Sequence, residues 1–435
     1  MTKSAGTTAT KLKRIAQLSG ENPGMKFKWL MPHFNRESLI DCFNELDGRK
    51  AVGADGVTKE QYQANLESNI DKLIARMKTM SYRPQPVRES LIPKESSGEF
   101  RALGISCFED KIVQRMLAKI LNAIYEPIFR DSSYGFRPNR SCHQALKSVS
   151  KYLYENKCET VIDVDLKNFF GTINHKILTS ALRIKIEDER FIRYVVRFLK
   201  AGVLSDGELR MTEEGSPQGN IASPILANVY AHYVIDVWFE DVVKKHIRGT
   251  AEMFRYADDI IICCQYSSDA ERIKNALGKR LVKYSLNMNQ RKTKLVEFSV
   301  KKFQEGKKQE TFDFLGFTFY IGKSRRGYPI VKLKISKVRL RSKLRKIKEW
   351  CKRNRDKMKL TPLWLRFISK IRGLVRYYGV SFNCRYVSGL LDQAVRIFIK
   401  WMNRRSQRKS LTFEEFNKFT KKFPLPRVRV YHPLF

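Results

Sequence analysis

Acidic residues are scarce in this sequence. Its 435 residues include 44 Asp and Glu against 84 Lys and Arg, which leaves a formal net charge of +40 at pH 7. A surplus of this size repels itself, and phosphates relieve the repulsion when Lys and Arg release their condensed counterions. The composition therefore indicates nucleic acid as the partner, with an anionic membrane surface as the rival.

Long apolar runs are also missing. No stretch approaches the roughly 20 apolar residues that a membrane-spanning helix needs, and no signal-peptide core follows Met1, so we expect an intracellular protein with no membrane partner. The eight cysteines form no C-x-x-C pair and no Cys/His group with zinc-ligand spacing, which predicts reduced core thiols. With 43% hydrophobic residues, the chain can fold into two or three domains.

Sequence patterns divide the chain into four parts. Residues 1–34 are basic and rich in Ser and Thr, which favours a basic N-terminal tail; an organelle transit peptide has a similar bias. Residues 35–155 carry helical patterns around an alternating, Pro-containing segment at 82–105 that suits short strands. Residues 156–325 mix β-type runs with helices. Residues 326–435 are expected to be helical and basic, because 18 Lys or Arg and only two acids lie within 332–376.

Two adjacent carboxylates give the sharpest chemical signal. Asp258 and Asp259 stand between two apolar, β-type runs in residues 254–262. Bare carboxylates with apolar flanks are unfavourable, and a hard divalent cation such as Mg²⁺ stabilises them effectively. An ordinary hairpin turn, in which Asp is common, is the alternative explanation of this dipeptide.

A second β-type run favours the metal site. Residues 161–166 alternate acidic and apolar side chains, which places Asp163 and Asp165 on one face of a strand. If this strand meets the turn at Asp258 and Asp259, three carboxylates can hold two Mg²⁺ ions, or Mn²⁺ in their place, for attack of a 3′-hydroxyl on a nucleoside triphosphate. We take Asp165, Asp258 and Asp259 as catalytic metal ligands, with Asp163 as the alternative to Asp165.

The tetrapeptide Tyr256-Ala-Asp-Asp259 resembles the polymerase signature of reverse transcriptases. Phe170, five positions after Asp165, is similar to the steric gate with which this family excludes a ribose 2′-hydroxyl. The resemblance therefore implies deoxynucleotide substrates and favours Asp165 over Asp163. Residues 216–219 resemble the family's loop beside the nascent base pair, which implies substrate-binding roles for Gln218 and Gly219 and, at the signature itself, for Tyr256.

Further motifs narrow the resemblance to the group II intron reverse transcriptases, also called maturases. Residues 82–94 and 101–105 look like their early fingers motifs, in which Lys94 and Arg101 match cations that contact the incoming triphosphate. Asn289 and Lys292, followed by Phe-Leu-Gly-Phe at 314–317, fit the end of the palm, and Lys292 is included among the substrate-binding residues. Residues 371–378 and 401–405 resemble the helical thumb called the maturase domain.

This resemblance implies an α/β right-hand polymerase. Fingers would occupy 35–155, a palm with inserted fingers elements 156–325, and an all-α basic thumb 326–435, whose Trp350, Trp364 and Phe367 are more typical of a core than of base-stacking platforms. The implied function is RNA-directed DNA synthesis in the cytoplasm of a bacterium. The implied partners are an RNA template, a DNA or RNA primer, deoxynucleoside triphosphates and the group II intron RNA that the protein helps to splice.

The sequence also departs from the family pattern. Gly171 stands where Asp is common and Asn220 where a second Gly is usual, but neither change removes a metal ligand. We expect no Cys/His-rich nuclease domain after the thumb, which argues against cleavage of a second DNA strand. Two other functions stay open: a splicing cofactor with a silent polymerase site, and an intron-independent reverse transcriptase of DNA repair or phage defence. For Arg137, contact with template phosphate and helix capping are equally favoured.

Overall fold

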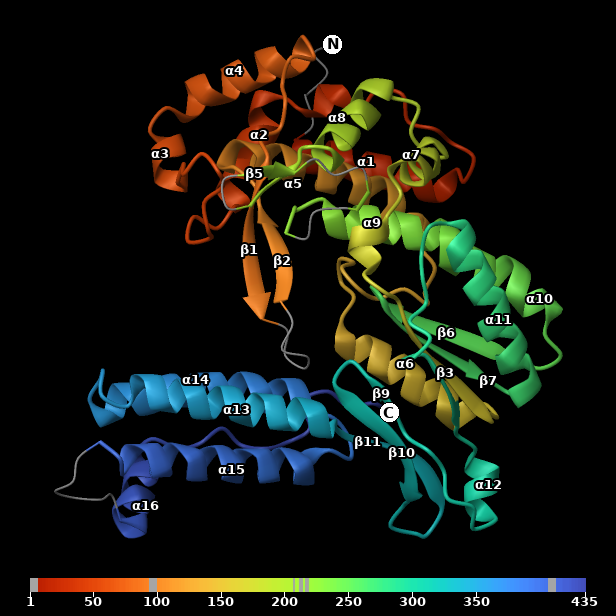
Figure 1. The fold of residues 1–435 in the computed structure, drawn as a ribbon, viewed down its shortest axis with the longest axis vertical. Coiled ribbons are helices and arrows are strands. Elements are labelled where there is room, and N and C mark those ends of the chain that lie inside the picture. The colour runs from red at the N-terminus through yellow and green to blue at the C-terminus, as the bar shows by residue number, and fades with distance from the viewer. Residues whose placement is uncertain (1–6, 94–99, 206–207, 211–213, 216–218, 406–411) are drawn as a thin grey trace.

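The computed structural model describes residues 7–93, 100–205, 208–210, 214–215, 219–405 and 412–435. Figure 1 shows a mostly helical N-terminal region with a projecting hairpin, a central region built on a sheet, and a C-terminal group of long helices. Helices accompany three β-sheets, so the expected mixed α/β class is confirmed. Within the described ranges, no helix combines the length and the apolar character needed to cross a membrane.

The N-terminal region is organised around one buried helix, α5 (Phe108–Tyr125), whose apolar residues recur on nearly every side. Seven further helices bury apolar residues in the same core. These are α1 (Thr8–Glu21), α2 (Arg36–Glu45), α3 (Lys59–Gln63), α4 (Leu66–Lys78), α7 (His175–Arg183), α8 (Glu189–Leu199) and α9 (Ser223–Ala231). Short 3₁₀ turns, η1 (Met31–His33) and η2 (Glu126–Ile128), join some of them.

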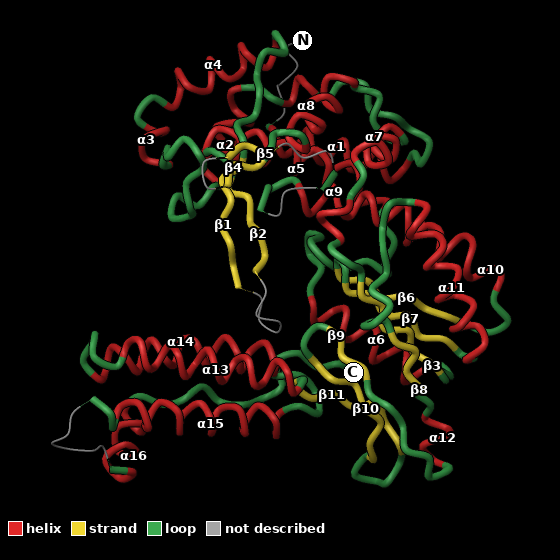
Figure 2. The backbone as a smooth tube through the Cα atoms, in the orientation of Figure 1, coloured by secondary structure: helices red, strands yellow, loops and turns green. Residues whose placement is uncertain are grey.

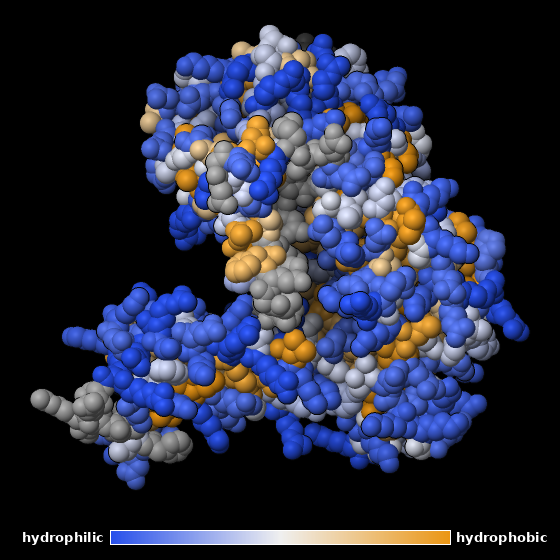
Figure 3. Space-filling model, in the orientation of Figure 1, coloured by the Kyte–Doolittle hydropathy of each residue, from blue (hydrophilic) through white to orange (hydrophobic). Residues whose placement is uncertain are grey.

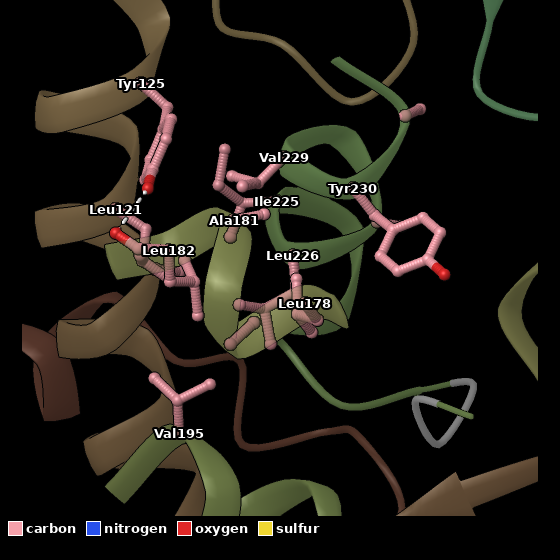
Figure 4. Packing of buried hydrophobic residues seen from close by; sticks show 14 of the residues in the cluster. Leu121, Tyr125, Leu178, Ala181, Leu182, Val195, Ile225, Leu226, Val229 and Tyr230 are labelled. Atoms are coloured by element: carbon pink, nitrogen blue, oxygen red, sulfur yellow. Dashed lines mark hydrogen bonds between the residues drawn. The ribbon is translucent and has the colours of Figure 1, made fainter. Parts of the chain in front are cut away.

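Figure 4 shows how this core is filled. Leu121 of α5 and Leu182 of α7 lie against each other, and Leu226 of α9 lies beside Leu178 of α7. The hydroxyl of Tyr125 donates a hydrogen bond of 3.2 Å to the carbonyl oxygen of Leu182, which satisfies the polar end of a buried ring. Helices far apart in the sequence are thereby joined into one body.

The expectation of a tail at 1–34 is wrong for the part that the structure describes. Helix α1 packs along α5, where Ile15 is buried and the Ser19 hydroxyl donates to the carbonyl of Ile124 at 2.6 Å. Farther along, the carboxylate of Asp188 accepts the backbone N–H of Leu30 at 2.8 Å. The apolar positions were too sparse among Ser, Thr and Lys for the sequence to reveal this packing.

The hairpin confirms the strands expected within 82–105. β1 (Val87–Pro93) and β2 (Phe100–Ile105) pair antiparallel, while β1 also pairs in parallel with β4 (Val203–Ser205), which pairs with β5 (Glu208–Arg210). The order is β2-β1-β4-β5. Leu91 and Phe100 near the tip are each 60% exposed, and Figure 3 shows hydrophobic residues there beside a hollow above the C-terminal helices.

The central sheet is antiparallel, with the strand order β6-β7-β3-β8. Its strands are β6 (Ala251–Tyr256), β7 (Asp259–Cys264), β3 (Thr160–Asp165) and β8 (Lys294–Glu297). Side chains alternate between two cores: Ile260 and Ile262 share one with α11 (Ser267–Lys283), while Ile261 and Cys263 share the other with α6 (Cys142–Glu155). Burial on both faces explains why β7 is apolar without interruption from Ile260 to Cys264.

The helical segment that begins with α9 contains two π-helical turns. After α9 the residues His232–Asp236 and Phe239–Val243 are π-helical, and α10 (Lys244–His246) ends the segment. The first of these turns carries Asp236, which is fully buried against the central sheet. Single π-helical turns are frequent near functional sites.

The C-terminal part is not all-α from residue 326, so that expectation is corrected. β9 (Phe312–Phe314), β10 (Phe317–Lys323) and β11 (Pro329–Ile335) form a sheet ordered β11-β10-β9, which follows α12 (Val300–Gln304). In β11, the buried residues Val331 and Leu333 alternate with Lys332 and Lys334. Because the lysines made the segment strongly basic, the alternation of apolar and polar residues that is typical of a strand was not recognised in the sequence.

Four helices complete the C-terminal part: α13 (Lys337–Asn354), α14 (Leu360–Tyr378), α15 (Cys384–Met402) and α16 (Phe413–Lys422). Trp364 and Phe367 are buried among them and Trp350 packs against them, so their assignment to a core is confirmed. Figure 2 shows the chain after α16 running back along these helices, and Tyr431 donates its N–H to the carbonyl of Gly379 at 2.7 Å. All eight cysteines are free thiols and six are buried.

Candidate active site

The central sheet brings the predicted carboxylates to one edge. In the register of β3 and β7, Asp165 lies directly opposite Asp259, and Asp258 occupies the turn between β6 and β7. Each carboxylate stands where a buried apolar strand ends, so packing holds the backbone while the side chains stay near solvent. The three acids are thus neighbours, and their role as metal ligands remains a prediction.

Two acids near this edge, Asp259 and Asp163, have raised pKa values. Asp259 keeps access to solvent, but nearby protein atoms reduce the hydration of its carboxylate. This desolvation, followed by the charges of Asp258 and Asp165, raises the pKa of Asp259 to about 6. Burial, followed by the charge of Asp259, raises the pKa of Asp163 to about 7. Asp163 pairs with Ile261, farther from the edge, so the geometry favours Asp165 as the partner of Asp259.

The segment after α11 holds Asp165 in place. The backbone N–H of Asn289 donates to the carbonyl of Asp165 at 2.8 Å, and the backbone N–H of Asp165 donates to the hydroxyl of Thr293 at 3.2 Å. The ammonium of Lys292 lies 3.9 Å from the Asp165 carboxylate; the Lys292 side chain is exposed and the Asp165 side chain is partly exposed. The predicted residue Lys292 is therefore beside the carboxylates.

Aromatic rings lie beside the strand that carries Asp165. Phe170 belongs to η3 (Phe169–Thr172) and packs edge-on against Phe169 and Phe136, with ring centroids 5.5 and 6.2 Å apart. Tyr256 ends β6, and burial together with the neighbouring Cys142 thiol raises the pKa of Tyr256 to about 12. The ring of Phe170 is thus held from two sides.

Two predicted substrate-binding motifs meet at a pair of glycines. Gly219 has φ +111°, and a Cβ atom there would lie 2.4 Å from the carbonyl oxygen of Gly104 in β2. Arg101 lies in β2 opposite Ile92, but its side chain is outside what the structure describes. Lys94 and Gln218 also lie outside the described residues.

Sequence reasoning missed Arg255, although it lies within the signature segment. Its side chain is completely buried and forms an ion pair with Asp236. A signal was present: Arg255 shares a face of β6 with Met253, which is fully buried, and an arginine in such a place needs buried partners.

The departures from the family pattern have local explanations. At Gly171 a Cβ atom would meet the amide nitrogen of Asn168 at 2.3 Å. The side chain of Asn220 accepts the N–H of Ala222 at 2.9 Å and so helps to start α9. Arg137 is 7% exposed and donates to the Glu126 carboxylate and to nearby carbonyls, which supports capping over contact with phosphate.

A cavity of about 230 Å³ opens beside Asp259. It is lined by the loop 314–316, the start of α13 and the acids Asp259 and Asp313. In the described ranges, no group of three or more His, Cys, Asp and Glu side chains is already arranged to hold a metal. The site is therefore an open row of carboxylates next to a cavity rather than a closed structural metal site.

The basic residues of the C-terminal helices face outward. Figure 3 shows hydrophilic residues over this part of the surface. Along α13 the exposed cations recur at helical spacing: Lys337, Arg341, Arg345, Lys348 and Lys352. The two acids within 332–376, Glu349 and Asp356, cannot neutralise this row of positive charges, so the row suits contact with a phosphate backbone.

A family model for "Reverse transcriptase (RNA-dependent DNA polymerase)" matches residues 92–319, about half of the chain. This range includes all three predicted catalytic carboxylates. The group II intron-encoded protein LtrA of Lactococcus lactis subsp. cremoris is 37% identical over 222 residues, which cover 51% of this chain and 37% of that protein.

Two further relatives extend the comparison. Protein YkfC of Escherichia coli is 32% identical over 321 residues, covering 65% of this chain and 83% of the relative. An uncharacterized 91 kDa protein in the cob intron of Schizosaccharomyces pombe is 38% identical over 211 residues, covering 48% of this chain and 26% of the relative. The chain thus spans well under half the length of the two intron-encoded relatives. It belongs to the reverse transcriptase family, among the reverse transcriptases and maturases of group II introns.

Proposed function

We propose that this protein is an RNA-directed DNA polymerase that extends a DNA or RNA primer with deoxynucleotides along an RNA template. The observation that carries the proposal is the pairing of Asp165 with Asp259 across two strands, with Asp258 in the adjoining turn. Membership of the reverse transcriptase family supports the same chemistry.

Asp165, Asp258 and Asp259 would hold two Mg²⁺ ions, or Mn²⁺ in their place. The closeness of the three acids supports this assignment, because neighbouring carboxylates repel one another until a cation binds them. When bound, the ions supply activation of the 3′-hydroxyl and stabilisation of the leaving pyrophosphate. The strands supply rigidity, so the carboxylates need little reorganisation to bind.

The substrate would lie beside this edge. Phe170 would exclude the 2′-hydroxyl, and Gly219 would let the backbone approach the nascent base pair. The remaining substrate-binding residues in this proposal are Lys94, Arg101, Gln218, Tyr256 and Lys292.

We assign fingers to 35–155, a palm with inserted fingers elements to 156–325 and a thumb to 326–435. Strand β11 of the assigned thumb pairs with β10, which belongs to the assigned palm. The hollow between the hairpin and the C-terminal helices would receive the template and primer. Exposed cations of α13 would contact phosphates without reading sequence.

The same basic surfaces would bind the parent intron RNA and assist its splicing. The relatives from Lactococcus and Schizosaccharomyces are intron proteins, which supports this second role. The bacterial sources of two relatives support action in a bacterial cytoplasm. A splicing cofactor without turnover, or a reverse transcriptase of DNA repair or phage defence, is the alternative.

Primer extension tests the polymerase. Wild-type protein with Mg²⁺, an RNA template and deoxynucleotides should extend the primer, and Asp258→Ala should abolish extension. Asp392→Ala, an exposed acid on α15, is the matched control and should retain full activity. Folded wild-type protein that binds RNA tightly and extends nothing would favour the splicing cofactor.

A further inference from the structure

Every guanidinium hydrogen of Arg255 has a partner inside the protein. Nε and Nη2 donate to the two carboxylate oxygens of Asp236 at 2.7 and 2.5 Å. Nη2 also donates to the Ser133 hydroxyl at 2.8 Å, and Nη1 donates at 3.2 Å to both the Asn228 side-chain oxygen and the carbonyl oxygen of Ala257. Five donors meet five acceptors, and Arg255 and Asp236 are both 0% exposed.

This arrangement does more than neutralise a charge. A buried ion pair loses its hydration, so an apolar pair of similar size often stabilises a fold equally well or better. What an apolar pair cannot do is orient several polar groups at once, which the planar fork of arginine does. The geometry of Arg255 therefore indicates that the orientation of its partners matters.

The partner that matters most is the carbonyl of Ala257. Ala257 precedes Asp258 and has φ +58°, a left-handed conformation that is unfavourable for a residue with a side chain. Gly135 also packs against Ala257, because a Cβ atom on Gly135 would come within 2.4 Å of the Ala257 nitrogen. The turn that presents Asp258 is thus clamped between Arg255 and Gly135.

The clamp also gathers segments that are distant in the sequence. The backbone of Arg255 accepts the N–H of Tyr134 at 2.8 Å, and its own N–H donates to the carbonyl of Ser132 at 2.8 Å. Asn228 donates from its amide to the carbonyl of Gly135 at 2.7 Å. α9, the π-helical turn with Asp236 and the strand-like segment 132–135 therefore all fix the same turn.

We propose that the Arg255–Asp236 pair is a positioning device for the polymerase site, which holds the peptide bond between Ala257 and Asp258 so that the Asp258 carboxylate faces Asp165 and Asp259. This inference rests on the proposed function. Arg255 itself touches no substrate and acts through the carbonyl of Ala257.

The test is Arg255→Lys, which keeps a positive charge for Asp236 but has no planar fork to reach Ala257 at the same time. The single-turnover rate of nucleotide addition, normalised to titrated active sites, should fall about 100-fold, as expected when a catalytic group is displaced. The affinity for the primer–template duplex should stay within about threefold, because the exposed cations proposed to contact it lie on α13, away from this turn.

Asp188→Asn is the matched control. Asp188 is also buried and accepts backbone N–H groups of Leu30 and Phe191, so its loss destabilises the fold far from the turn. The fraction of Asp188→Asn molecules with a titratable active site should fall, while the single-turnover rate per active site should equal that of the wild type. A wild-type rate per site in Arg255→Lys would overturn the proposal and leave Arg255 with a structural role only.

A second readout does not depend on turnover. Titration of Mn²⁺ followed by electron paramagnetic resonance should show weaker binding in Arg255→Lys and unchanged binding in Asp188→Asn. If Arg255→Lys does not fold by circular dichroism, Asp236→Asn replaces it and should show the same pattern. Wild-type protein that does not extend a primer would refute the proposed function. The Mn²⁺ titration would still test the positioning role of Arg255, because equal Mn²⁺ affinity in all variants would overturn that role.

Discussion

Gly219 and Gly104 approach each other so closely that a methyl group on Gly219 would lie 2.4 Å from the Gly104 carbonyl oxygen. Because that oxygen belongs to β2 and cannot move freely, Gly219→Ala should displace the loop, and its φ of +111° adds strain. We expect the rate of primer extension to fall at least about tenfold, with a loss of about 1–3 kcal/mol in the free energy of unfolding. Extension assays and urea denaturation measure the two effects.

Gly306 provides the control for this substitution. It also has a positive φ, +83°, but a Cβ atom there would meet nothing within 4 Å. Gly306→Ala should cost about 1 kcal/mol in stability and leave the extension rate unchanged. Equal slowing in both variants would show that a positive φ, rather than the contact with Gly104, explains the effect at Gly219.

Phe170 and Phe169 are adjacent but differently placed, which separates a gate from a core residue. Phe170 is half-buried, whereas Phe169 is 3% exposed. Phe170→Ala should raise the incorporation of ribonucleotides relative to deoxynucleotides by at least about tenfold, since the lost ring no longer fills the space of a 2′-hydroxyl. Phe169→Ala should reduce stability by about 3–5 kcal/mol without changing sugar selection. Unchanged selection in Phe170→Ala would contradict the gate.

Asp110 should make stability depend on pH. It is buried, it accepts the Tyr82 hydroxyl and the backbone N–H of Gln85, and burial raises its pKa to about 7. The unfolded chain releases this proton near pH 4 and the folded protein only near pH 7, so the free energy of unfolding falls as pH rises between these values. The contribution approaches about 4 kcal/mol.

Asp110→Asn isolates this effect from the other carboxyl groups. The free energy of unfolding of the wild type minus that of the variant should decrease between pH 4.5 and pH 7.5 and level off above that range. Urea denaturation at several pH values measures it. A difference that does not change with pH would show that Asp110 is ionised throughout.

Trp364 should be the main anchor of the C-terminal helices. It is 0% exposed, its indole N–H donates to the Phe423 carbonyl at 2.9 Å, and its ring lies 4.9 Å from that of Phe398. Trp364→Ala should lower the free energy of unfolding by about 3–5 kcal/mol and expose the region after α16 to protease. Trp29, which is 80% exposed, is the control, and Trp29→Ala should change stability by about 0.5 kcal/mol or less.

Local patterns were enough to predict the carboxylate edge. A β-type run that ends at Asp165 predicted β3, and two mostly apolar runs on either side of Asp258 and Asp259 predicted the turn between β6 and β7. The pairing of Asp165 with Asp259 could only be assumed, since no local pattern specifies which strands become neighbours. The resemblance to a family supplied that step.

Elsewhere, composition concealed structure. Lysines hid the alternation of β11, and Ser and Thr hid the packed face of α1. The ion pair of Arg255 with Asp236 could not be predicted either, because it joins a strand to a π-helical turn 19 positions away through tertiary packing. An arginine inside a β-type run was the only local indication.

The pairing of β3 with β7 and β8 bears on when the protein can begin to work. β3 ends at Asp165, and its second partner ends only at Glu297, so about two thirds of the chain must leave the ribosome before the sheet can close. Pairing over such separations is also slow, because a long loop must be ordered first. Where one RNA is both message and template, the ribosome therefore translates about two thirds of this sequence before the polymerase can fold and copy the RNA. Translation of that part then precedes reverse transcription.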